Sequence, residues 1–191
     1  MRSILSRAAV GVVVCLGFAS AAVADDYTID AVHSSVSFKI KHMGLSYVHG
    51  RFNAFSGAFS VDSADPSKTS FKMSIKSQSV DTNNPARDNH LKSPEFFNAK
   101  QYASIEFKSS SVKPIEGGYE VTGDLTLRGE TKPITFKLEG GEVIKDARMG
   151  TKTGFSTDFV IKRNDFGVGK AMQMLGEDVH VSIGFEGTKK K

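Results

Sequence analysis

Residues 121–139 read VTGDLTLRGETKPITFKLE, two alternating runs joined by a short polar step. Apolar side chains or glycine recur at every second position through residues 121–127, and again at Ile134, Phe136 and Leu138. An alternation of period two gives each strand one apolar and one polar face, which is typical of an antiparallel sheet. The Arg128-Gly129 step between the two runs is short enough for a tight hairpin turn. The stretch therefore predicts two neighbouring antiparallel strands.

The same alternation extends from this hairpin in both directions along the chain. It predicts further strands at residues 35–41, 50–61, 71–76, 104–112, 155–161 and 179–185. Glycine and proline mark turns between them at residues 62–67, 116–118 and 140–141. Antiparallel sheets remove their edges best by closing on themselves, and eight strands enclose side chains or one small ligand. We therefore expect an all-β protein, an eight-stranded antiparallel barrel.

One segment departs from the alternation. Residues 81–101 read DTNNPARDNHLKSPEFFNAKQ and contain two prolines. This composition predicts a loop with one or two short helical turns, inserted between the third and fourth strands. The adjacent aromatic residues Phe96 and Phe97 in this polar connection indicate a cover that packs over one end of the barrel.

The first 24 residues have the pattern of a cleavable secretory signal peptide. Arg2 and Arg7 precede an apolar run over residues 8–23, and the run ends in Ala22-Val23-Ala24. This order of basic, apolar and small residues is the secretory signature, and the run falls short of the ~20 apolar residues that a membrane span requires. We expect a signal peptide at residues 1–24 and one domain at residues 25–191.

Composition excludes several kinds of chemistry in that domain. The single cysteine, Cys15, lies in the signal segment, so no disulfide or catalytic thiol is expected after cleavage. Val14 precedes Cys15, whereas a lipoprotein signal requires a small residue there, so no lipid anchor is expected. Nucleotide-binding and hydrolase motifs are missing from the sequence. Aromatic residues are not interleaved with the outward lysines, which argues against a nucleic-acid partner.

The residues leave two questions open. Many of the chain's 14 phenylalanines fall on the apolar strand faces, where they either fill the core or line a long apolar pocket. Periodicity does not separate these two interpretations. His42 and His49 flank the turn at residues 43–48, and ordinary hydrogen-bonded loop histidines are the favoured interpretation. The alternative is that they converge with His33 at one barrel mouth as a proton or metal site.

Seven short motifs in one order carry a family resemblance. They read DAVHSSVSF at 30–38, KHMG at 41–44, GRFNAFSG at 50–57, DNHLKSPEFF at 88–97, GDLTLRG at 123–129, KRNDFG at 162–167 and VHV at 179–181. In this order and spacing the chain resembles the YceI-like family of bacterial periplasmic proteins, from Tyr27 to about Gly187.

The resemblance implies a lipocalin-like barrel with a long apolar interior, associated with polyisoprenoid chains, isoprenoid quinones and other long-chain amphiphiles. It also implies homodimer pairing and no established catalytic activity. The residues expected to line the ligand cavity are Val36, Phe38, Ile40, Phe71, Met73, Ile75, Phe96, Phe97, Phe107, Leu125, Leu127, Phe136 and Phe159. His33, His42 and Arg163 are expected to bind a polar headgroup, with a structural pairing of Arg163 and Asp165 as the alternative.

The predicted function is that of a periplasmic carrier, without a membrane anchor, metal or cofactor, that holds a long lipid in its barrel. The alternative is a periplasmic enzyme or redox accessory that acts on a quinone-like substrate through histidines at the barrel mouth. Ligand identity stays open, because a hydrophobic tube discriminates weakly between chains of similar width.

Overall fold

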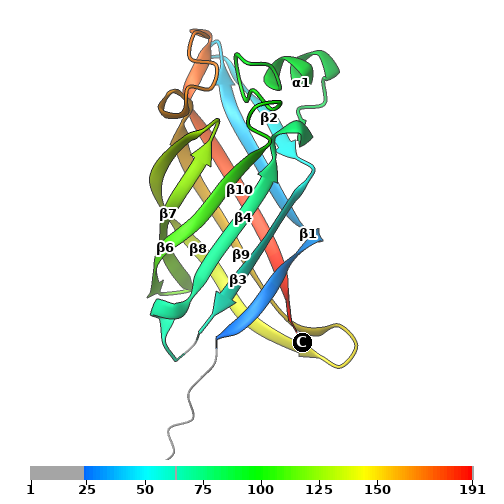
Figure 1. Cartoon of the computed structure of the whole chain (residues 1–191), viewed down its shortest axis with the longest axis vertical. Coiled ribbons are helices and arrows are strands. Elements are labelled where there is room, and N and C mark those ends of the chain that lie inside the picture. Colours follow the sequence, from blue (N-terminus) through cyan, green and yellow to red (C-terminus); the bar gives the residue numbers. More distant parts are fainter. Residues whose placement is uncertain (1–23, 63, 191) are drawn as a thin grey trace, which may run out of the picture.

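In a computed structural model that describes residues 24–62 and 64–190, the chain forms one antiparallel sheet rolled into a closed barrel (Figure 1). The signal peptide expected at residues 1–24 lies outside the described residues, apart from Ala24. Within the described residues, none of the helices has the length and hydropathy needed to cross a bilayer.

The strands are β1 (Asp25–His42), β2 (Ser46–Phe52), β3 (Phe55–Val61), β4 (Ser70–Lys76), β5 (Val80–Asp81), β6 (Ser104–Ile115), β7 (Gly118–Leu127), β8 (Glu130–Asp146), β9 (Gly150–Lys162) and β10 (Leu175–Lys189). The described helices are α1 (Pro85–Leu91) and three 3₁₀ turns, η1 (Pro66–Lys68), η2 (Ser77–Ser79) and η3 (Arg163–Phe166).

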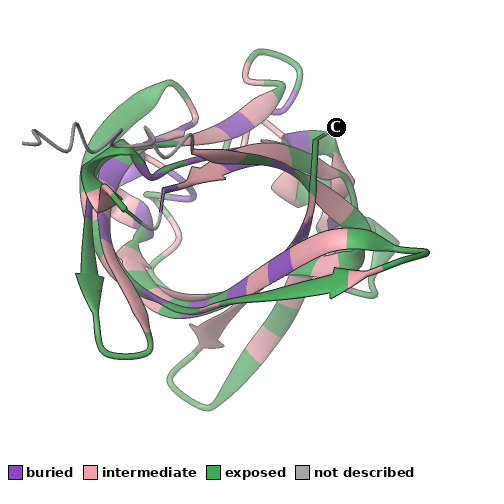
Figure 2. Cartoon of the chain, turned by 90° about the horizontal axis from the view of Figure 1, so that it is seen from below, coloured by how far each residue is buried: buried purple, intermediate pink, exposed green. Residues whose placement is uncertain are grey.

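Pairing between the first and last strands closes the sheet. β1 pairs with β10 on one side and, on the other, with β2 along its second half and β3 along its first half. β2 and β3 thus act as one interrupted wall strand, and β5 adds only two residue pairs beside β2. The wall has eight strands, so the predicted eight-stranded antiparallel barrel with one short helical insertion is confirmed. Seen from below, the wall is a continuous ring (Figure 2).

The hairpin of β7 and β8 forms as its sequence predicts. β7 and β8 pair in a single register, with Val121 opposite Phe136. Arg128 and Gly129 both have positive φ, 53° and 81°, which fits the tight turns whose twist matches that of the strands. The prediction of a turn at residues 140–141 is wrong, because β8 continues to Asp146. The two glycines produce a bulge there, with φ of 114° and 102° and a register shift against β9.

β1 begins well before the predicted run, and a second irregularity hides its start. The register against β10 shifts between Asp30 and Ser35, so residues 31–34 bulge out of the ladder. Val32 at the top of this bulge is 85% exposed. The bulge interrupts the alternation, which is why the periodic signal starts only after it.

An aromatic plug closes the lower end of the barrel, where the C-terminus lies in Figure 1. The plug consists of Tyr27, Phe59, Phe71, Phe155 and Phe185, none more than 8% exposed. The ring of Phe59 is central, with centroids of the other four rings 5.0–5.8 Å away in stacked or edge-on contacts. The lower end of the barrel is therefore a packed core.

Two connections cover the upper end. One carries α1, whose first turn is capped by the Asn84 side chain accepting from the Arg87 amide. The other joins η3 to β10, and the Gly169 amide donates to the Glu95 carbonyl at 2.9 Å, which links the two covers. Phe96 is buried beneath them, and the Phe97 ring lies 5.5 Å from that of Phe52.

Candidate ligand-binding cavity

Between the plug and the cover the barrel is hollow. The cavity has a volume of about 410 Å³, within the ~300–1,000 Å³ typical of small-molecule pockets. Phe38, Phe136 and Phe159 point into it and remain only partly buried, in contrast to the closely packed plug. Protein cores pack with few voids larger than a water molecule, so a space of this size is a cavity and not a packing defect.

All thirteen residues expected at the cavity lie in its lining. They come from β1, β4, β6, β7, β8, β9 and the connection that carries α1. Closure of the sheet thus places side chains that are far apart in the sequence around one space. The placement does not test ligand contact, which stays a prediction.

The lining also contains residues that were not expected at the cavity from the sequence. Some continue the inward faces of strands already recognised, so their alternation carried the signal: Ile134, Ile161, Val179, Val181 and Ile183. Others come from the two connections that cover the upper end and from the first residue of β10, where no periodic pattern marks them: Leu91, Val168, Met172, Met174 and Leu175. Arg87 and His90 of α1 add polar side chains at the upper end.

Arg163 lines the cavity, but its guanidinium donates all of its observed hydrogen bonds to backbone carbonyls. Nε donates to the Gly176 carbonyl at 2.8 Å, and Nη2 donates to Met172 at 2.8 Å and Leu175 at 3.1 Å. Nη1 donates to Val168 and Gly169. The side chain is only 5% exposed, and burial lowers the pKa of its guanidinium. Arg163 therefore holds the loop between η3 and β10 in place, and its partners are carbonyls instead of Asp165.

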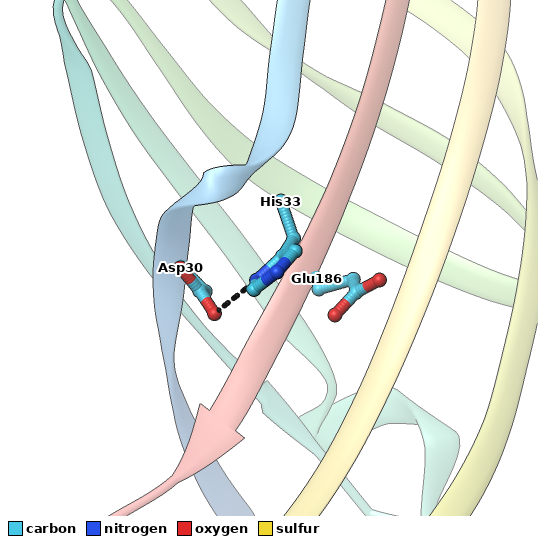
Figure 3. A group of neighbouring side chains, drawn as sticks. All are labelled: Asp30, His33 and Glu186. Atoms are coloured by element: carbon cyan, nitrogen blue, oxygen red, sulfur yellow. Dashed lines mark hydrogen bonds and ion pairs between the residues drawn. The ribbon is translucent and has the colours of Figure 1, made fainter.

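His42 lies at the cavity and His33 does not. His42 ends β1 at the upper rim and lines the space. His33 stands on the β1 bulge, where its Nδ1 lies 2.8 Å from Asp30 Oδ2 (Figure 3). Nine residues of strand span roughly 30 Å, so the two rings lie far apart. His49 pairs opposite Lys39, whose neighbour Phe38 faces inward, so His49 is on the outer face. The alternative in which the three histidines converge at one mouth is therefore wrong.

The Asp30–His33 pair belongs to an ionic cluster on the outside of the wall. A carboxylate oxygen of Asp30, a ring nitrogen of His33 and a carboxylate oxygen of Glu186 lie within 4.8 Å of one another. Lys152 Nζ lies 3.3 Å from Asp30 and 4.0 Å from Glu186, so an ammonium already supplies positive charge to both carboxylates. The His33 hydrogen bond, followed by that of Lys152, lowers the pKa of Asp30 to about 2. The cluster fastens the bulge to β9 and β10.

A closed antiparallel barrel with an aromatic plug, a covered upper end and an apolar cavity defines a lipocalin-like class of protein. Within that class the chain belongs to the YceI-like family, because the YceI-like domain matches residues 27–187.

Relatives and solved structures agree with this assignment. The chain is 39% identical over 175 residues to a UPF0312 protein of Serratia proteamaculans, covering 91% of each chain. It superposes on the Campylobacter jejuni YCEI protein with a TM-score of 0.71 at 34% identity, covering 79% of this chain and 90% of that one. A polyisoprenoid binding domain from Saccharophagus degradans shares the fold, with a TM-score of 0.65 at 17% identity over 86% of this chain and 98% of that one.

Proposed function

We propose that this protein is a periplasmic carrier that holds one long apolar ligand, a polyisoprenoid, an isoprenoid quinone or a similar amphiphile, inside its barrel. The observation that carries the proposal is the cavity of about 410 Å³, lined largely by aliphatic and aromatic side chains and closed below by the plug. The order of basic, apolar and small residues at 1–24, which is the pattern of a secretory signal, supports the periplasmic location.

The energetics of transfer favour such a ligand. Each methylene-sized unit that leaves water for an apolar site gains ~0.8 kcal/mol, so a dry tube binds a long chain without special polar contacts. Members of the same fold include the domain from Saccharophagus degradans, which is described as polyisoprenoid binding.

A polar headgroup needs hydrogen-bonding partners at the upper end of the cavity. All three guanidinium nitrogens of Arg163 are bonded to carbonyls and His33 lies outside. The polar side chains that remain in place are His42, Arg87 and His90, whose Nε2 lies 2.7 Å from Glu95 Oε2 and whose other ring nitrogen remains for a ligand. Arg87 Nε and Nη2 bond to Thr82, each at 2.8 Å, so the guanidinium is held in a fixed orientation. We assign the headgroup to these three residues. Since His33 and His49 do not join His42 at the cavity, the geometry gives no support to the histidine site of the enzymatic alternative.

A pair of tryptophan substitutions on β10 tests the proposal. Every strand pairing of the closed sheet lies at or after Asp25, so a chain that begins there contains the whole barrel. Val181 points into the cavity between Phe38 and Phe159, while the next residue, Ser182, is exposed on the outer face. Val181→Trp fills the cavity, and Ser182→Trp is the matched control.

The two variants are purified without detergent and their organic extracts are compared by mass spectrometry. We expect Ser182→Trp to yield the same lipid as the unchanged protein and Val181→Trp to yield little or none. Since the chain has no other tryptophan, its fluorescence reports whether the side chain at 181 is buried. Equal ligand recovery from both variants, with a buried indole at 181, would contradict a ligand inside the barrel.

A further inference from the structure

Three exposed apolar residues meet at the upper end of the barrel. Met43 and Leu45, in the turn between β1 and β2, are 54% and 79% exposed, and Met174, just before β10, is 58% exposed. The Met43 amide donates to the Met174 carbonyl at 2.7 Å, so the two segments are joined. Figure 1 shows both segments at the same end as α1. We call Met43, Leu45 and Met174 the apolar tip.

The apolar tip is continuous with the cavity. Met174 is exposed on the outside and also lines the cavity, and its neighbours Met172 and Leu175 line it as well. An apolar chain passing over Met174 would meet thioether and aliphatic side chains from the surface to the interior. The aromatic plug offers no comparable passage at the lower end, because its rings are in mutual contact.

Positive charge flanks the apolar tip. The ammonium groups of Lys39 and Lys41 lie 5.1 and 5.3 Å from the Tyr47 ring, on the outer face just below the turn. Among the residues that the structure describes, neither lysine forms an ion pair. The nearby carboxylates of Glu177 and Asp178 share one ammonium, that of Lys162, at 3.4 and 3.6 Å. Together with Lys39 and Lys41, three lysines stand against two carboxylates, so the surface beside the tip carries a net positive charge.

We propose that the apolar tip docks on an anionic lipid bilayer, with Met43, Leu45 and Met174 inserted among the acyl chains and Lys39 and Lys41 at the headgroups. Apolar side chains bordered by lysines are the pattern that binds membrane interfaces, through buried apolar area and attraction to anionic lipids. Docking would place the cavity entrance against the bilayer, so that the ligand passes between the two without crossing water. The purpose of docking rests on the proposed carrier function.

The test uses two double variants of the chain that begins at Asp25. Met43→Ser/Leu45→Ser changes the apolar tip without altering a residue of the cavity lining. Val143→Ser/Ile144→Ser is the matched control, since these residues of the β8–β9 hairpin at the opposite end are 49% and 65% exposed. Binding is measured by sedimentation with equimolar phosphatidylcholine–phosphatidylglycerol vesicles, and with phosphatidylcholine vesicles alone.

We expect the unchanged protein and the control to sediment with the anionic vesicles, and the tip variant to bind them at least about tenfold more weakly. Lys39→Gln/Lys41→Gln should weaken binding to anionic vesicles by roughly tenfold and leave phosphatidylcholine binding unchanged. Equal binding by the tip variant and the control overturns the proposal. So does a dimer of the unchanged protein that becomes monomeric in the tip variant, because the tip would then face a second copy.

Ligand content separates this proposal from the carrier function. The tip variant should retain its bound lipid in extracts, since its cavity is intact, yet load added lipid from vesicles more slowly than the control. Bound lipid without vesicle binding would contradict docking and leave the carrier function standing. Vesicle binding by a barrel that yields no lipid would contradict the carrier function and leave docking standing.

Discussion

Arg163 organises the upper end of the molecule through a single buried guanidinium. Its five hydrogen bonds reach carbonyls between Val168 and Gly176, the loop that supplies Met172 and Leu175 to the cavity. A planar fork with fixed donors can satisfy carbonyls on several sides at once, whereas an ammonium acts as one point charge. The sequence motif KRNDFG marked this arginine, but its partners are main-chain atoms that no side-chain pattern reveals.

Replacement of Arg163 separates loop support from headgroup binding. Arg163→Lys keeps the charge but leaves buried carbonyls without donors, so we expect the free energy of unfolding to fall by about 2–4 kcal/mol. Urea unfolding measures this change. If Arg163→Lys keeps full stability and loses only ligand, the guanidinium binds the headgroup and does not support the loop.

The Asp30 carboxylate makes the free energy of unfolding depend on pH in the acid range. Its pKa is lowered to about 2, mainly by the His33 hydrogen bond, against ~3.9 in an unfolded chain. The ionised form is thus favoured by folding, and its contribution is present above about pH 4 and is lost as the pH falls towards 2. Asp30→Asn should therefore lose less stability than the unchanged protein between about pH 5 and pH 2, as measured by urea unfolding.

Asp124→Asn, at an exposed position of β7, serves as the control for that titration. An acid dependence that is identical in the unchanged protein and in Asp30→Asn would show that the bulge cluster does not contribute.

At the scale of elements, strand pairing was predictable where the signals are local. The β7–β8 hairpin combines alternation with Arg128-Gly129, and both can be read without knowing the partner. The glycine pair at residues 140–141 fits a turn or a bulge equally well, and the register against Phe155 of β9 decides between them. The prediction that His33 and His42 lie together at the ligand headgroup was wrong. The bulge in β1 interrupts the alternation, so the sequence pattern did not show that His33 belongs to the same long strand as His42.

Two strand glycines, Gly187 and Gly50, lie directly against phenylalanine rings, and this contact predicts the effect of replacing each by alanine. A Cβ at Gly187 would lie 2.3 Å from the Phe59 ring, which the plug holds on several sides, and a Cβ at Gly50 would lie 2.4 Å from the Phe38 ring, which borders the cavity. We expect Gly187→Ala to lower the free energy of unfolding by about 1–3 kcal/mol, and Gly50→Ala by less, because only Phe38 can yield into open space. Equal losses in urea unfolding would mean that the cavity end is as tightly packed as the plug.

At the scale of the whole molecule, the barrel was predictable from its strands and the hollow was not. An inward phenylalanine has the same periodicity beside a ligand as beside another core residue. The difference arises from how the closed sheet spaces its walls. Rings crowd around Phe59 at the lower end, whereas above it a cavity of about 410 Å³ separates the walls, with Phe38, Phe136 and Phe159 in its lining. The cover residues Met172 and Met174 belong to loops, so only the assembled fold brings them to the cavity.

The measurement that tests the carrier most directly is mass spectrometry of the organic extract of protein purified without detergent, combined with a structure of the same sample. We expect about one prenyl or other long-chain lipid per barrel, and electron density for it in the cavity between the plug and the cover. An extract without any apolar molecule, from a barrel whose side chains have closed the cavity of about 410 Å³, would contradict the proposed function.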